Sequence, residues 1–109
     1  MNADEMRETL IQMLKQLQSD MEALYQQGAG YYTCIPFARR YNKLLGRARE
    51  LLAATGGIID TFDDLPESDP KDPSEKSKVL QEIKIESRQL VTLLESARKR
   101  DAGGEGSDR

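Results

Sequence analysis

Histidine is absent from this chain of 109 residues, and cysteine occurs once, at position 34. Without histidine the chain has no imidazole base for a catalytic triad and no histidine ligand for a metal. A single cysteine excludes an internal disulfide framework and any zinc site built from several cysteines. These absences exclude most classes of enzyme. We therefore expect a protein that is not an enzyme and that uses neither a cofactor nor a metal.

Long apolar runs are also absent, and the first residues are polar. A membrane span needs about 18 consecutive apolar residues, and a secretory signal needs an apolar core near the N-terminus. One unpaired cysteine suits a reducing compartment. The chain is long enough for one domain, and 32% of its residues are charged. The sequence therefore predicts a cytoplasmic, single-domain protein that does not contact a membrane.

Apolar residues recur at helical spacing in three segments, which predict helices over about residues 3–27, 36–54 and 73–100. Each helix carries a single apolar face, so the three helices must bury these faces against one another. The predicted fold is an all-α, three-helix antiparallel bundle that forms one domain over residues 1–100. Residues 101–109 contain three glycines and almost no apolar side chain, so we expect a disordered tail.

The starts of these helices have recognisable signals. Asn2 and Glu5 have the spacing of a capping box, in which each side chain bonds to the other residue's backbone. Pro36 suits the first turn of the second helix, and Asp72 followed by Pro73 gives the third helix an acidic N-cap.

The helical spacing also predicts which residues form the core. On the first helix the expected apolar face consists of Met6, Leu10, Met13, Leu14, Leu17, Met21, Leu24 and Tyr25. The faces of the other two helices contain Leu45 and Leu90 near their centres. Ile11 and Ile85 lie outside the main stripes, and Ser87 lies inside one, where it needs a backbone partner or a place at the rim.

Residues 55–72 form a long connection between the second and third helices. About 17 extended residues reach about 55 Å, which is enough to recross the bundle, so the third helix can run in either direction. An up-down-up order is the default expectation. The prolines and the missing glycine in this acidic segment do not fit a calcium-binding loop of the EF-hand type.

Four large apolar residues interrupt the acidic residues of this connection, and a plain solvated linker would not carry them. One interpretation is a short helical turn that caps the open end of the bundle. The other is a segment that binds a partner. Together with the aromatic residues around the first turn, these residues form a candidate partner surface: Tyr31, Tyr32, Phe37, Ile58, Ile59, Phe62 and Leu65.

A basic stripe on the second helix is the alternative site. Arg40, Lys43 and Arg47 recur at helical spacing beside the apolar face, so they are candidate phosphate-binding residues. Acidic residues of the first helix and of the connection are placed to neutralise them. Cys34 precedes the second helix, where a helix dipole can stabilise a thiolate, but its apolar neighbours favour a packed cysteine.

The combined features favour a small, non-catalytic protein whose function is protein–protein interaction, as a homodimer or as an adaptor. Phosphate or nucleic-acid binding by the second helix is the alternative. The net charge of −3 argues weakly against a dedicated nucleic-acid-binding protein. Nothing in the sequence indicates a small-molecule substrate.

Overall fold

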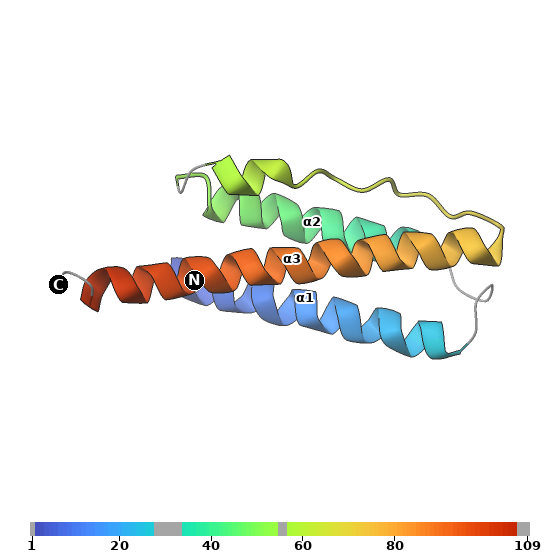
Figure 1. Cartoon of the computed structure of the whole chain (residues 1–109), viewed down its shortest axis with the longest axis horizontal. Helices are drawn as coiled ribbons and strands as arrows, with labels where there is room; N and C mark the ends of the chain where they lie inside the picture. The colour runs from blue at the N-terminus through green and yellow to red at the C-terminus, as the bar shows by residue number, and fades with distance from the viewer. Residues whose placement is uncertain (1, 28–33, 55–56, 107–109) are drawn as a thin grey trace.

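The computed structural model describes residues 2–27, 34–54 and 57–106, with residues 98–106 described by their backbone alone. Within these ranges the chain forms helices and no strand. The elements are three α-helices and one 3-10 helix: α1 (Ala3–Gln26), α2 (Ile35–Leu51), η1 (Gly57–Thr61) and α3 (Pro73–Gly106). Helix α1 packs against both other helices, and the molecule is 55 Å long (Figure 1). The predicted all-α, three-helix bundle is confirmed.

The predicted helix starts are confirmed by their hydrogen bonds. The backbone N–H of Glu5 donates to Asn2 Oδ1 at 2.8 Å, and the N–H of Asn2 donates to Glu5 Oε1 at 3.1 Å, which completes the capping box. At the start of α3, the N–H of Ser74 donates to Asp72 Oδ1 at 3.0 Å. These bonds satisfy backbone donors that a helix start leaves without intrahelical partners.

The end of the third helix differs from the prediction. Helix α3 continues to Gly106, so residues 101–106 are helical where a disordered tail was expected. Glycine lowers the stability of a helix by about 1 kcal/mol relative to alanine but leaves its backbone N–H able to bond, and no proline interrupts this stretch. Residues 107–109 lie outside the described part of the chain.

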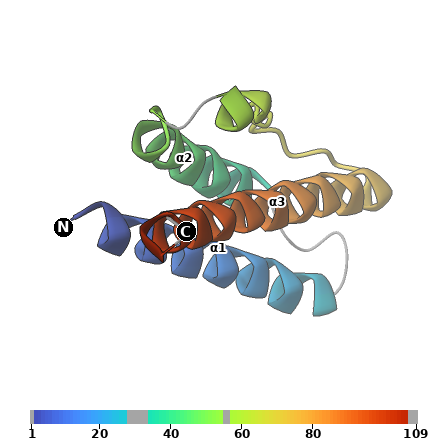
Figure 2. The same cartoon turned by 60° about the vertical axis from the view of Figure 1, so that its left-hand side comes forward.

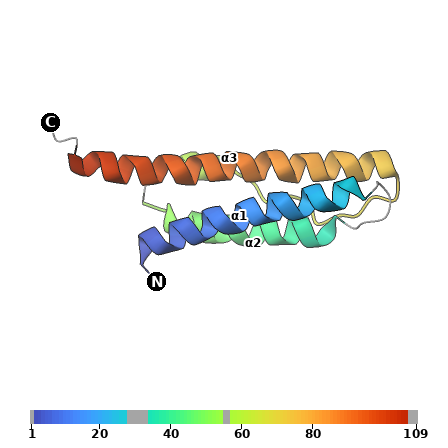
Figure 3. The same ribbon diagram turned by 90° about the horizontal axis from the view of Figure 1, so that it is seen from below.

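The direction of the helices follows from the ion pairs that join them. Asp20 of α1 pairs with Arg40 of α2 at 2.9 Å, while Lys15 and Glu22 of α1 pair with Glu95 and Lys84 of α3. Helix α1 is therefore antiparallel to both, and α2 and α3 run in the same direction (Figures 1 and 3). The default up-down-up order does not occur, because the connection crosses back along the bundle before α3 begins.

The core agrees with the predicted faces on α2 and α3 and departs from them on α1. Leu17, Leu45 and Leu90 are fully buried, as expected. On α1, however, Ile11 is buried while Met13 is 47% exposed. Helix α3 packs on the side of α1 that carries Lys15 and Glu22, which rotates the buried face toward Ile11 and away from Met13.

Two polar groups lie in this core without a partner in the described part of the chain. Ser87 is fully buried, and its Oγ has no hydrogen-bond partner among the described residues. The sequence predicted either a backbone partner or a position at the rim, and neither occurs. The hydroxyl of the fully buried Tyr41 is also unpartnered, and burial, together with the charge of Glu86, raises its pKa above the usual value.

The connection docks on α2, which confirms the interpretation of a short helical turn packed on the bundle. Its first part is η1, which lies beside the end of α2 (Figure 2). We call the following residues 62–72 the strap. Ile59 of η1 and Phe62 at the start of the strap are buried in the core. The Asn42 amide donates to the carbonyl of Leu65 and accepts from its N–H, both at 2.8 Å.

The far end of the strap is held by Asp69. Its Oδ1 accepts the backbone N–H of Cys34 at 3.1 Å and pairs with Lys76 Nζ at 2.7 Å. The Lys76 side chain is 9% exposed, so this ion pair is largely shielded from solvent. One carboxylate therefore joins the strap to the starts of α2 and α3.

A matched pair of substitutions tests whether the connection is docked in solution. We expect Phe62→Ala to lower the free energy of unfolding by about 3–5 kcal/mol, because it removes a buried aromatic side chain. Ile58, which is 60% exposed, is the control, and Ile58→Ala should change stability by less than about 0.5 kcal/mol. Urea unfolding followed by circular dichroism measures both. Similar small effects would mean that the connection is not docked.

Candidate functional site

The predicted partner surface does not form an exposed patch in the described part of the chain. Phe37, Ile59 and Phe62 are buried, and Leu65 is half-buried against them. Ile58 alone among the described members is largely exposed. Ile59 and Phe62 of the connection join the core instead, and Leu65 packs against it. Tyr31 and Tyr32 lie outside the described residues.

The predicted phosphate-binding stripe is partly neutralised. Arg40 pairs with Asp20 at 2.9 Å, and this hydrogen bond, with a second from Gln16, lowers the pKa of the Asp20 carboxyl. Arg47 lies 3.4 Å from Glu50, in an exposed pair. Lys43 forms no hydrogen bond or ion pair with any described residue. Within the described ranges, Lys43 is therefore the member of the stripe that has no partner.

The sequence predicted that acidic residues of the connection would face the stripe, but in the structure the strap pairs with basic residues on the opposite side of α2. Arg39 pairs with Glu67 at 3.3 Å, and Arg49 pairs with Asp64 at 2.9 Å while donating to the carbonyl of Phe62 at 2.7 Å. These contacts place the strap along one flank of α2. A phosphate would therefore have to compete with these carboxylates for the arginines of that flank.

The flank of α2 opposite the strap borders an open groove. We call this the α1/α2 groove, and it has a volume of about 640 Å³. Its lining residues come from both helices: Met6, Thr9, Leu10, Met13, Lys43, Leu44, Gly46, Arg47 and Glu50. A hollow of about 220 Å³ extends it past Met6 toward the start of α1 and the end of α2, where Ala3 and Leu51 face each other.

The groove combines an apolar floor with a polar rim. Leu10 and Leu44 reach the floor from the core, and Met6 and Met13 line the α1 wall. Among the described residues, Arg40–Asp20 is the ion pair that joins α1 to α2, and it lies beyond the lining residues. The apolar periodicity of the first helix predicted both methionines in the core. Their position at the edge of the apolar stripe, beside Thr9, was the signal that they border solvent.

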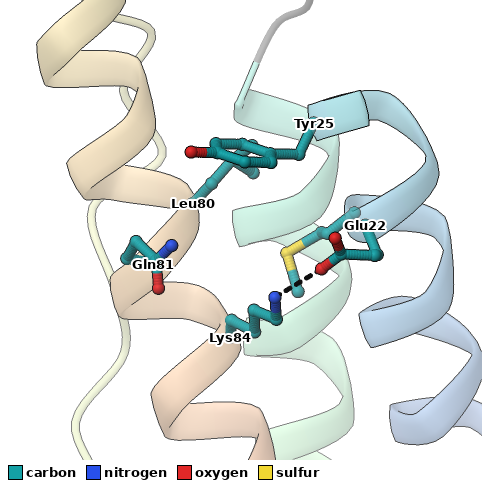
Figure 4. Close-up of a pocket in the computed structure, with 6 residues that line it drawn as sticks. Glu22, Tyr25, Leu80, Gln81 and Lys84 are labelled. Atoms are coloured by element: carbon teal, nitrogen blue, oxygen red, sulfur yellow. Dashed lines mark hydrogen bonds and ion pairs between the residues drawn. The ribbon is translucent and has the colours of Figure 1, made fainter. Parts of the chain in front are cut away.

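Two hollows lie along the seam between α1 and α3. One is open, has a volume of about 580 Å³ and is lined by Tyr25 of α1 and by residues of α3, namely Ser77, Lys78, Gln81, Glu82, Ile85 and Glu86. The other is nearly closed. Figure 4 shows this small pocket, in which Tyr25 lies above Leu80 and Glu22 reaches Lys84. Hydrogen bonds from Lys84 and Gln26 lower the pKa of the Glu22 carboxyl. The pocket volume is about 10 Å³, enough for about one water molecule. It has no room for a ligand.

Cys34 is packed at the start of α2 and is fully buried. Its Sγ lies 3.7 Å from the carbonyl oxygen of Lys76. Burial, reinforced by the negative charge of Asp69, raises the pKa of the thiol and disfavours the reactive thiolate. The geometry therefore supports the packed cysteine that its apolar neighbours predicted.

Two other kinds of site were sought in the described ranges. No group of three or more cysteine, aspartate or glutamate side chains there is arranged to hold a metal ion. No helix in those ranges combines the length and the apolar character that crossing a bilayer requires.

Thiol labelling tests the packing of Cys34. In the native protein near pH 8, we expect an aromatic disulfide reagent to react with Cys34 far more slowly than with the same chain in urea, because reaction needs local opening. Absorbance of the released thiolate measures the rate, and glutathione serves as the exposed reference. A native rate close to that of glutathione would make Cys34 an accessible nucleophile.

Comparison with known proteins adds no assignment to this geometry. No protein-family model, no curated protein and no solved structure matches the chain.

Proposed function

We propose that this chain is a non-catalytic helical bundle that acts in protein–protein interaction, and that the α1/α2 groove is the surface that binds the partner. The observation that carries the proposal is an apolar groove left open between two helices whose other flanks are covered. The strap covers α2 on one side, and α3 covers α1. Apolar surface that a fold leaves open in a groove is typical of a binding site.

The residues of the groove suit a protein partner. Met6 and Met13 have flexible, polarisable side chains that adapt to different apolar surfaces. Charged and polar side chains surround this apolar floor, an arrangement common in interfaces with an apolar centre and a polar rim. An open groove along two helices also accommodates an extended or helical segment better than it encloses a small molecule.

Phosphate or nucleic-acid binding remains the alternative for the same face of α2. Lys43 supports it as a cation without a partner among the described residues, whereas the ion pairs of Arg40 and Arg47 argue against it. Binding to phosphates releases counterions, so its affinity falls steeply with salt, while binding to an apolar groove depends on salt much less. Nucleic-acid binding that vanishes between low and physiological salt would favour the alternative.

A matched pair of charge insertions tests the proposal. Met13 and Ile85 have similar exposed fractions, 47% and 44%, but Met13 lines the groove and Ile85 lies on α3 away from it. We expect Met13→Glu to abolish binding of the proteins captured from native lysate, because a partner would have to bury the new charge. Ile85→Glu should leave capture unchanged, as quantified by mass spectrometry.

Two controls make this result interpretable. Circular dichroism should show that both variants keep wild-type helix content, because both sites are exposed. Sedimentation equilibrium should show whether the bound protein is a second copy or a different chain, against a monomer mass of 12.3 kDa. Capture that is equally sensitive to both substitutions, or to neither, would contradict the groove as the binding surface.

A further inference from the structure

The strap keeps its path along α2 without the bonds that hold regular secondary structure in place. Residues 63–71 lie outside the helices and take part in none of the backbone-to-backbone hydrogen bonds of the described chain. Pro66 and Pro70 lie in this stretch, and proline has no N–H to donate. The position of the strap therefore depends on side chains, both its own and those of other elements.

Apolar contact holds the strap at one end only. Phe62 is buried in the core, and Leu65 is half-buried against it. Residues 66–72, which we call the distal strap, contain no large apolar side chain, and all of them except Pro70 are exposed. A segment with few buried apolar contacts opens more easily than the helices around it.

Asp69 is the residue that ties the distal strap to buried groups. Its carboxylate accepts the N–H of Cys34, which is fully buried, and pairs with Lys76, which is 7% exposed. Loss of these contacts would leave a buried ammonium group and a buried N–H without this partner, which is costly. The other ion pair of the distal strap joins Glu67 to Arg39 at 3.3 Å, and both side chains are substantially exposed, so it contributes little.

We propose that the strap is a gate over one flank of α2, that it opens as a single unit while the three helices stay folded, and that Asp69 holds it closed. Opening would uncover this flank from the start of α2 at Cys34 to Arg39 and Asn42, which the strap contacts when it is closed (Figure 1). The gate lies on the side of α2 opposite the α1/α2 groove, so it does not rest on the proposed function.

Two backbone N–H groups report on the gate, because each donates across the boundary between the strap and α2. The N–H of Leu65 donates to Asn42, and the N–H of Cys34 donates to Asp69. If the strap opens as a unit, hydrogen exchange followed by NMR should give these two amides protection factors that agree within about threefold. Both should lie at least about tenfold below the protection factor of Leu45, in the middle of α2.

Two results of this measurement would overturn the gate. Equal protection of all three amides would mean that the strap opens only when the whole chain unfolds. Clearly different protection at Leu65 and Cys34 would mean that the two ends of the strap open separately.

A charge-removing substitution tests the role of Asp69 at a distance. We expect Asp69→Asn to speed exchange of the Leu65 amide by about tenfold or more, because hydrogen bonds to charged groups are the stronger ones. Asp63→Asn is the control, since Asp63 is an exposed strap residue without an ion pair to any described residue, and it should change this rate less than about threefold. Circular dichroism should show wild-type helix content in both variants.

The reciprocal substitution keeps the test decisive if Asp69→Asn also weakens the fold. Asn42→Ala removes both bonds to Leu65 and leaves the contacts of Asp69 in place. A single gate requires that it speed exchange of the Cys34 amide. Leu65 exchange that is insensitive to Asp69→Asn, or Cys34 exchange that is insensitive to Asn42→Ala, would show that the two contacts are independent and would overturn the proposal.

Discussion

Asn42 holds the strap against α2 through two hydrogen bonds to the backbone of Leu65, and much of the architecture depends on this contact. An extended segment outside a sheet has no neighbouring strand to bond its backbone N–H and C=O groups. The Asn42 amide supplies both partners for Leu65, because an amide side chain can donate one hydrogen bond and accept another. The strap can therefore run along α2 as ordered structure. Because it returns the chain to the start of α2, α3 begins beside α2 and runs parallel to it (Figure 1).

The docked strap also determines which surfaces of the bundle remain open. Its contacts with Arg39, Asn42 and Arg49 occupy one flank of α2. Helix α3 then packs on the side of α1 that carries Lys15 and Glu22. The remaining flanks of α1 and α2 face each other across the groove. The open groove is thus a consequence of the path of the connection, and not of any one residue that lines it.

The sequence predicted the helices well because apolar periodicity and capping residues are local signals. It did not predict the direction of α3, since a connection of this length is compatible with both orders. It also placed Met13 in the core and Ile11 outside it. Both lie at edges of one apolar stripe, and only the position of α3 decides which edge is buried. The local sequence pattern therefore predicts the buried face of a helix to within about one residue position. The packing of the neighbouring helix decides where that buried face ends.

The candidate site was harder to predict for a related reason. Phe37 and Phe62 are of a residue type that is common in interfaces, but aromatic residues are also common in cores. Both side chains are buried in the core. The basic stripe was visible in the sequence, yet its residues differ in their surroundings. Arg40 meets Asp20 across the helix pair, whereas no carboxylate of the described chain reaches Lys43. Such pairings depend on the register between helices, which the sequence does not specify.

These two differences together explain which side chains surround the α1/α2 groove. Ile59 and Phe62 of the connection are buried in the core. In the described chain the exposed large apolar side chains are Met13, Tyr25, Ile58 and Ile85. Of these, Met13 lies in the α1/α2 groove. The same path of the strap neutralises the basic residues on its own flank of α2 and none on the other. The exposed Met13 therefore lies in one groove with the Arg47–Glu50 pair and with Lys43, which has no partner in the described part of the chain. A partner that buried Met13 would meet both signs of charge at the α2 rim, so its affinity would depend mainly on apolar contact, because exposed ion pairs contribute little.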